Sequence, residues 1–199
     1  MCGCKRKGKG LRISGGIAKG RKIKLVHGPE PLRPTPAKVR EALFDILRKK
    51  IEGATFVDLY AGTGAIGIEA MSRGALKAIF VEDNRFRVEE IRRLVRSAGF
   101  TEKSMIIAKK ARLFLADAFR KNEKFDIIFL DPPYHTEEIE HVLSDLGEMD
   151  MLKSGGVVVA EHFVKRKLPT ISGRLQLIKN YTYGDTVLSV YSVSEVSDD

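Results

Sequence analysis

Short apolar runs of strand length alternate with segments of helical period along most of the chain. A strand is expected where a few apolar or β-branched residues lie between turn residues, and a helix where apolar residues recur every three or four positions. The expected strands are residues 55–59, 78–81, 105–108, 125–130 and 157–160. The expected helices are residues 36–52, 65–73, 85–98, 111–120 and 137–146. This alternation predicts an α/β fold with a mostly parallel sheet that helices cover on both faces.

The end of the chain breaks the alternation. Residues 175–178 and 186–193 have strand patterns with no helix between them, so we expect a terminal antiparallel pair. The length of 199 residues fits one domain with a small appendage and a sizeable core. No apolar run approaches the length of a membrane helix, and no apolar signal segment follows the basic start. We therefore expect a soluble, cytosolic protein.

Positive charge is concentrated at the start of the chain. Residues 1–29 contain nine Lys and Arg and no Asp or Glu, which leaves 26 basic against 26 acidic residues in the rest. The formal net charge of +9 therefore comes from this segment, and such a segment on a neutral body favours binding to a polyanion. A solubilising tail is an equal alternative for residues 1–10. Residues 11–26 also have apolar side chains that can pack, and there the nucleic-acid interpretation is favoured.

The two cysteines indicate neither a metal site nor a disulfide framework. Cys2 and Cys4 lie in a glycine- and lysine-rich start, where no His or further Cys is near enough to complete a set of zinc ligands. We therefore expect no metal ion, and we interpret both thiols as incidental or reactive groups.

A glycine turn follows the first of the alternating strands. The six residues from Gly62 to Gly67 match the pattern G-x-G-x-x-G between a strand and a helix, and Glu82 ends the next strand, twenty residues after Gly62. These features alone fit an NAD-binding domain, in which the carboxylate accepts hydrogen bonds from ribose hydroxyls. Asp58, just before the turn, favours S-adenosylmethionine instead. A second carboxylate suits the amino group and sulfonium of that cofactor, whereas it would repel a pyrophosphate.

A proline-containing tetrapeptide closes the fourth strand of the alternation. Asp131, Pro132, Pro133 and Tyr134 come directly after residues 125–130, and two prolines prevent the strand from continuing in the sheet. The carboxylate and the ring are then held at the cleft. Hydrogen bonds from an exocyclic amine to Asp131 would aim the nitrogen lone pair at a methyl group, and Tyr134 can stack on the base. These four residues are the expected catalytic residues.

With these motifs, the chain resembles the bacterial RsmD-type family of 16S ribosomal RNA guanine-N2 methyltransferases from about residue 11 to residue 193. The most specific matches are Arg33-Pro34-Thr35 and the segment from Val39 to Phe44, together with Arg12-Ile13-Ser14-Gly15-Gly16, Gly20-Arg21-Lys22 and Tyr183-Gly184-Asp185-Thr186. The resemblance implies a Rossmann-like methyltransferase fold and transfer of a methyl group from S-adenosylmethionine to the N2 amine of guanine 966. The implied partner is 16S ribosomal RNA or a small-subunit assembly intermediate. We expect the protein to be a monomer.

With the resemblance, the expected domains and the full sets of cofactor-binding and RNA-binding residues can be stated. We expect a basic RNA-binding arm of strands or a hairpin over residues 1–26 and a methyltransferase domain over residues 27–199. The expected cofactor-binding residues are Asp58, Tyr60, Ala61, Gly62, Gly64, Glu82, Asp83, Lys110 and Ala111. The expected RNA-binding residues are Arg12, Lys19, Arg21, Lys22, Arg33, Thr35 and Arg40.

The chain departs from the family pattern in two places, and two alternative functions remain open. Many methyltransferases have an acidic residue after the third strand, whereas this chain has Lys109-Lys110-Ala111, so an adenine contact there would be backbone or apolar. The first nine residues are not part of the resemblance. The alternatives are a DNA adenine-N6 or protein glutamine-N5 methyltransferase, whose amines the tetrapeptide also suits, and an RNA-binding protein on the same fold without activity. The basic arm disfavours a protein substrate.

Overall fold

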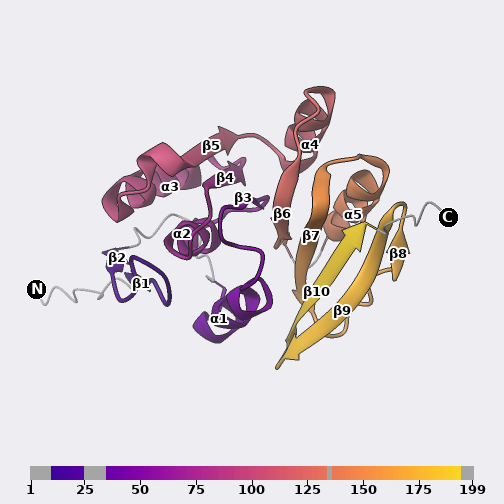
Figure 1. Ribbon diagram of the computed structural model, residues 1–199, viewed down its shortest axis with the longest axis horizontal. Coiled ribbons are helices and arrows are strands. Elements are labelled where there is room, and N and C mark those ends of the chain that lie inside the picture. The colour runs from indigo at the N-terminus through magenta and orange to yellow at the C-terminus, as the bar shows by residue number, and fades with distance from the viewer. Residues whose placement is uncertain (1–9, 25–34, 134–135, 194–199) are drawn as a thin grey trace, which may run out of the picture.

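An eight-stranded sheet lies at the centre of the molecule, of which a computed structural model describes residues 10–24, 35–133 and 136–193 (Figure 1). The strand order is β5-β4-β3-β6-β7-β10-β9-β8. The strands are β3 (Thr55–Asp58), β4 (Lys77–Glu82), β5 (Ser104–Ala108), β6 (Phe125–Leu130), β7 (Leu152–Phe163), β8 (Ile171–Ser172), β9 (Leu175–Tyr183) and β10 (Thr186–Val193). β3 to β7 run parallel, and β8, β9 and β10 pair antiparallel. The predicted α/β fold with a terminal antiparallel pair is confirmed.

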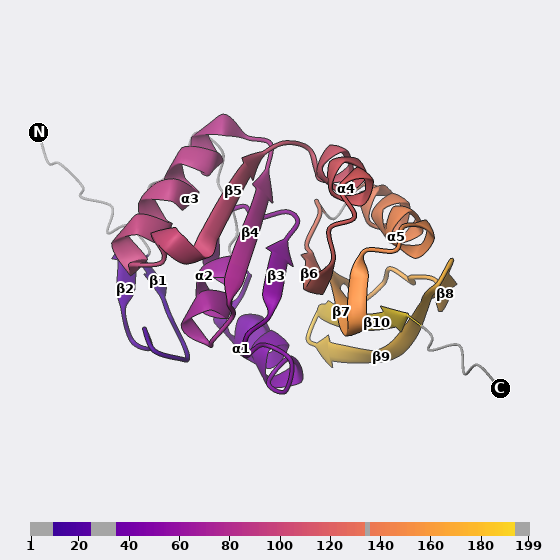
Figure 2. The same cartoon turned by 45° about the horizontal axis from the view of Figure 1, so that its top comes forward.

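Within the described residues, five α-helices cover the two faces of this sheet. They are α1 (Ala37–Ile46), α2 (Ala65–Ser72), α3 (Arg85–Ala98), α4 (Ala111–Arg120) and α5 (Glu138–Glu148), with a short 3₁₀ turn η1 (Thr101–Lys103). On one face, α1, α2 and α3 pack on side chains such as Phe56, Phe80 and Phe129. On the other, α4 and α5 lie beside each other over Val57, Ile128 and their neighbours (Figure 2). None of the described helices is long and apolar enough to cross a membrane.

Several predicted boundaries were wrong, among them the end of β9, which runs to Tyr183 instead of residue 178. α1 ends at Ile46 rather than at residue 52, because Leu47 and Ile51 continue the apolar spacing as buried residues of a turn. Pro36 is the N-cap of α1 and not its first helical residue. α5 begins at Glu138 because the Thr136 hydroxyl donates to the Pro133 carbonyl at 3.0 Å instead of capping a helix.

Strand β7 is also longer than predicted. It begins at Leu152, before the glycine pair Gly155-Gly156, instead of at Val157. The pairing of β6 with β7 shifts register between Phe125 and Ile127, and Gly155 has a φ of +70°. A glycine pair usually marks the end of a strand in a sequence, but here it lies at an irregularity within one.

The basic segment at the start of the chain forms a hairpin within residues 10–24. β1 (Gly10–Arg12) pairs antiparallel with β2 (Lys22–Lys24), and the hairpin lies against α3 (Figures 1 and 2). Ile13 and Ile23 are buried in the same core cluster as Met71 and Ile91 of α2 and α3. This part of the segment therefore contributes to the core as well as to the charge of the surface.

The loop of this hairpin is fitted to the end of α2. The Ile17 amide donates to the Ser72 carbonyl at 2.7 Å, and the Ser72 hydroxyl donates to the Gly15 carbonyl at 2.6 Å. Gly16 has a φ of +74°, and a Cβ at this position would lie 1.7 Å from the Ser72 carbonyl oxygen. The Ser-Gly-Gly motif of the resemblance therefore has a packing role, because only glycine permits this approach.

Candidate active site

The order of the chain reverses at β3, which lies between β4 on one side and β6 on the other. In open α/β sheets a ligand binds beyond the carboxyl ends of the strands at such a switch point. Asp58 is the last residue of β3, Glu82 is the last residue of β4, and Asp131 directly follows β6. The topology therefore brings the three carboxyl groups predicted from the sequence to one edge of the sheet.

The glycine turn after β3 combines packing with access. Gly62 and Gly64 have φ values of +51° and +72°, and Gly64 is the N-cap of α2. A Cβ on Gly67 would lie 2.3 Å from the ring of Phe80, so this glycine lets α2 approach the sheet. Above Gly62, in contrast, the nearest atom to a Cβ would be the Tyr60 carbonyl oxygen at 3.8 Å. A ligand can therefore approach the backbone at Gly62.

Glu82 holds the glycine turn in place from the neighbouring strand. Its Oε2 accepts a hydrogen bond from the Gly62 amide at 2.9 Å, and its Oε1 accepts from the Asn84 amide at 3.0 Å. Burial raises the pKa of this carboxyl group, while these amides and the nearby Arg87 oppose the shift. Each carboxylate oxygen has two acceptor positions, so Glu82 can bind the turn and still accept from a ligand hydroxyl.

Asp58 is almost completely buried beneath the turn. It is 1% exposed, and it accepts a hydrogen bond from the Gly67 amide at 3.2 Å, in the first turn of α2. Burial raises the pKa of Asp58 to about 7, against the effect of this hydrogen bond, and the charges of Asp131 and Glu82 raise it further. Burial and mutual repulsion both disfavour the ionised forms of these carboxyl groups, and a nearby positive charge favours them. This edge of the sheet is therefore a favourable environment for a positively charged ligand.

Asp131 lies at the same edge, with only partial exposure to solvent. Burial raises the pKa of its carboxyl group, and a hydrogen bond donated by the Thr35 hydroxyl lowers it. Pro132 is buried and Pro133 is exposed, and both line a small depression with Ile139, Glu161, His162 and Arg166. Tyr134, the fourth expected catalytic residue, lies outside the described residues.

The remaining expected cofactor residues lie around the same strand ends. Ala61 is buried, and Tyr60 is held towards α5 because its hydroxyl donates to Glu138 at 3.0 Å. Asp83 is exposed directly after β4. Lys110 is the N-cap of α4 and Ala111 is its first residue, next to β5, whose last residue pairs with Glu82. These positions lie around the same edge of the sheet as Asp58, Glu82 and Asp131.

The expected RNA-binding residues fall into two groups. Arg12, Lys19, Arg21 and Lys22 are exposed on the hairpin. Arg33 lies outside the described residues, and Thr35 contacts Asp131. Arg40 is only 5% exposed, and its Nη2 donates to the Arg12 carbonyl at 2.9 Å. In this arrangement Arg40 supports the hairpin from beneath and does not present its guanidinium to an RNA.

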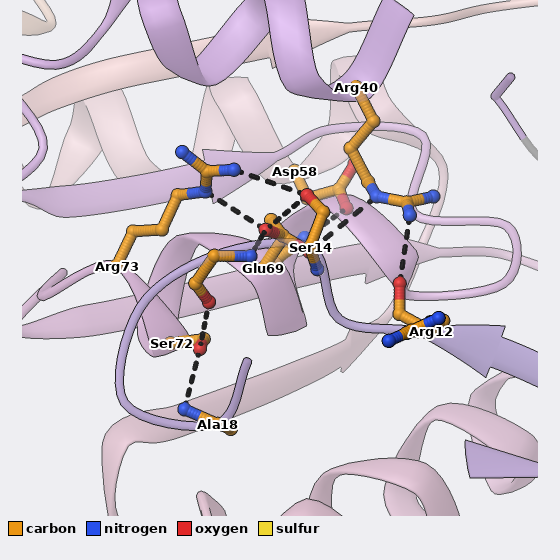
Figure 3. A network of polar contacts seen from close by, with 10 residues as sticks. Arg12, Ser14, Ala18, Arg40, Asp58, Glu69, Ser72 and Arg73 are labelled. Carbon is orange, nitrogen blue, oxygen red and sulfur yellow. Dashed lines mark hydrogen bonds and ion pairs between the residues drawn. The ribbon is translucent and has the colours of Figure 1, made fainter. Parts of the chain in front are cut away.

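Arg40 belongs to a buried network centred on Glu69 of α2, which sequence analysis missed (Figure 3). Glu69 is 1% exposed and lies 3.5 Å from the Arg40 Nε. It accepts hydrogen bonds from the Ser14 amide at 2.9 Å, the Gly15 amide at 2.7 Å and the Arg73 Nε at 2.9 Å. A signal was available, since a single acidic residue in the apolar run from Ala65 to Met71 indicates a buried carboxylate that needs partners.

Comparisons with known proteins agree with this arrangement. The model of the family described as Conserved hypothetical protein 95 matches residues 11–192. The chain is 34% identical over 181 residues to the YlbH protein of Bacillus subtilis, covering 91% of this chain and 98% of that protein. It is 31% identical over 183 residues to ribosomal RNA small subunit methyltransferase D of Escherichia coli, covering 91% and 89%.

Solved structures give the same result for the fold. The Escherichia coli protein yhhF matches with a TM-score of 0.80 at 27% identity, covering 94% of this chain and 99% of that one. An RNA methyltransferase from Salinibacter ruber, in complex with S-adenosyl-L-homocysteine, matches with a TM-score of 0.63 at 18% identity, covering 84% and 98%. Together with the site at the switch point, the match over residues 11–192 shows that the chain belongs to the Conserved hypothetical protein 95 family, the RsmD-type family that its motifs resemble.

Proposed function

We propose that this protein transfers a methyl group from S-adenosylmethionine to the exocyclic N2 amine of a guanine in small-subunit ribosomal RNA, guanine 966 by resemblance. The observation that carries the proposal is the meeting of Asp58, Glu82 and Asp131 at the switch point, with two prolines fixing the last of them at the cleft. The names of the Escherichia coli and Haemophilus influenzae relatives, ribosomal RNA small subunit methyltransferase D, support rRNA as the substrate.

The residues present fit S-adenosylmethionine. The open backbone at Gly62 admits a nucleoside, and Glu82 is placed to accept hydrogen bonds from its ribose. The buried carboxyl of Asp58 suits a positively charged ligand, because its pKa is raised by burial and a nearby cation would favour its charged form. When bound, the cofactor supplies an electrophilic methyl group on a positively charged sulfur.

The protein contributes mainly position and the exclusion of water. The target guanine must leave its stack to reach the sheet edge. There the Asp131 carboxylate accepts a hydrogen bond from the N2 amine, which fixes the direction of the nitrogen lone pair, and it takes the proton that the amine loses. The two prolines end β6 and hold this carboxylate at the mouth of the site.

The direct test is to locate the methyl group. The full chain is incubated with labelled S-adenosylmethionine and three unmethylated substrates, namely naked 16S rRNA, an assembly intermediate and intact small subunits, and the products are analysed as nucleosides. We expect N2-methylguanosine from at least one substrate. Labelled N6-methyladenosine would contradict transfer to the N2 amine of guanine. Cofactor binding by calorimetry without transfer to any substrate would favour an RNA-binding protein without activity.

Glu82 is expected to carry cofactor affinity. In Glu82→Ala the ribose loses its acceptor and the Gly62 amide loses its partner. Because a hydrogen bond to a charged group contributes about 1.5–3 kcal/mol, we expect binding of S-adenosylmethionine to weaken roughly 10- to 100-fold in calorimetry. Glu89→Ala removes an exposed carboxylate from α3 and serves as the control. Equal affinities for the two variants would remove Glu82 from the site.

The hairpin is expected to bind RNA phosphates through exposed lysines. Deleting the whole arm would also remove the buried Ile13 and Ile23, so it would confuse RNA binding with folding. Substituting Lys19 and Lys22 with Gln removes two charges from the surface alone. Each lost phosphate contact lowers the slope of log affinity against log salt by about 0.7–0.9, so we expect a decrease of up to about 1.8.

The matched control for this experiment removes the same charge elsewhere. Lys121 and Lys179 are exposed after α4 and on β9, and their substitution with Gln should leave the salt slope unchanged. RNA affinity is measured at several salt concentrations, together with the melting temperature. A hairpin variant with the wild-type slope would show that Lys19 and Lys22 do not contact phosphates.

A further inference from the structure

We infer that Thr35 is a positioning residue for methyl transfer, whose hydroxyl orients the Asp131 carboxylate towards the amine. This inference rests on the proposed function. Thr35 belongs to the Arg-Pro-Thr motif, for which the resemblance implies contact with RNA. In the structure its side chain instead donates a hydrogen bond to Asp131.

Thr35 lies at the N-terminal end of α1. Thr35 comes directly before Pro36, the N-cap of α1, and the Pro36 carbonyl accepts a hydrogen bond from the Arg40 amide at 3.0 Å. α1 is buried on the sheet through Val39, Leu43 and their neighbours. The hydroxyl is thus carried by a residue that leads directly into a buried helix, and sites supported by helices are positioned more accurately than sites on loops.

The surroundings of Asp131 explain why such a donor is needed. Asp58 lies at the end of β3, and its pKa is raised in part by the charge of Asp131. Glu161 of β7 is one residue beyond Ala160, which pairs with Leu130, so it is the strand neighbour of Asp131. His162 of β7 and Arg166 line the depression next to Pro132 and Pro133. The nearest strands thus bring two further acidic groups to the carboxylate.

Burial favours the protonated form of Asp131, which cannot take the proton that the amine loses. The Thr35 hydroxyl favours the ionised form, since it lowers the pKa of Asp131. Its removal should raise that pKa further. Activity depends on the ionised carboxylate and rises with pH through this pKa, so the acid limb of the pH profile should move to higher pH.

The experiment compares Thr35→Val, which keeps the shape of the side chain, with Thr35→Ser, which keeps the hydroxyl. Turnover of labelled methyl transfer is measured from pH 6 to 9.5 at saturating cofactor and RNA. For Thr35→Val we expect the acid limb to shift upward by about one pH unit from the pKa of about 7, with turnover about fivefold lower at pH 7 and near that of the wild type at pH 9. Thr35→Ser should restore the wild-type profile, and RNA affinity should be unchanged in both.

Other results would overturn the inference. A wild-type pH profile with weaker RNA binding would make Thr35 an RNA contact. An equal loss at all pH values with a lowered melting temperature would make its role one of folding. Carbon-13 NMR titration of Asp131 in the cofactor-free protein tests the role of Thr35 separately from the proposed function, because the titration does not depend on methyl transfer. If the wild type transfers no methyl group, the proposed function fails, whereas an Asp131 titration that is unchanged in Thr35→Val contradicts the inference itself.

Discussion

Replacing Asp131 with alanine is expected to reduce methyl transfer at least a hundredfold while S-adenosylmethionine still binds. A positioned acid–base group contributes about 10²–10⁴ to a rate, and Asp131 also fixes the direction of the amine. The cofactor contacts that we propose come from Asp58, Glu82 and the glycine turn, none of which needs the Asp131 side chain. The expected signature is therefore a large loss of turnover with a small change in cofactor affinity.

Two further variants make this prediction sharper. Asp131→Asn keeps an oxygen that accepts a hydrogen bond but loses the charge that takes the proton, so it should retain more activity than the alanine variant. Asp150→Ala removes an exposed carboxylate that pairs with Lys124 and Arg174 before the start of β7, at the opposite end of the parallel strands from Asp131, and it should transfer methyl groups at the wild-type rate. An alanine variant at Asp131 with full activity would refute the proposed mechanism.

The strands that carry the three carboxyl groups could be predicted from sequence because local patterns determine them. A run of buried residues such as Phe125 to Leu130 is recognisable by composition, and a parallel arrangement brings the residues that follow such runs to one edge. The positions of Asp58, Glu82 and Asp131 follow from this rule, together with the glycine turn. What each carboxylate contacts was not predictable in the same way.

The missed features depend on contacts between segments far apart in the chain. Arg40 looked like a surface residue of a helix next to a basic arm, and only the fold shows that the hairpin covers it. The contact of Thr35 with Asp131 was missed because it joins residues nearly a hundred positions apart in the chain. Thr35 was instead assigned to RNA by resemblance. Glu69 was passed over in an apolar helix because its partners lie on the hairpin and α1, whose positions no periodicity predicts.

Replacing Glu69 with alanine is expected to have the largest effect on stability of any change considered. Glu69 is 1% exposed, and its removal leaves the 5% exposed Arg40 as a buried charge without its carboxylate partner. Removing one member of a buried ion pair costs about 3–5 kcal/mol, a large fraction of the stability of an ordinary domain. The amides of Ser14 and Gly15 also lose their acceptor.

Two measurements distinguish this effect from an ordinary surface substitution. Denaturant unfolding gives the loss of stability, with Glu89→Ala as the control, because its exposed pair with Arg92 should contribute no more than about 1 kcal/mol. Hydrogen exchange of the Ser14 and Gly15 amides reports whether the hairpin loop separates from α2 before the sheet unfolds. A loss below 1 kcal/mol with unchanged exchange would contradict the role that we assign to Glu69.

We expect the same network to connect stability with RNA binding. If Glu69 and Arg40 hold the hairpin on α1 and α2, then Glu69→Ala should weaken RNA binding even though the variant gains one positive charge, which by itself would strengthen it. Loss of the hairpin support should weaken RNA binding, whereas the added positive charge should strengthen it. The direction of the change in RNA affinity therefore distinguishes the two effects, under conditions where the variant remains folded. Tighter RNA binding by Glu69→Ala would show that the hairpin charges act without the support of the buried network, as a mobile polycation would.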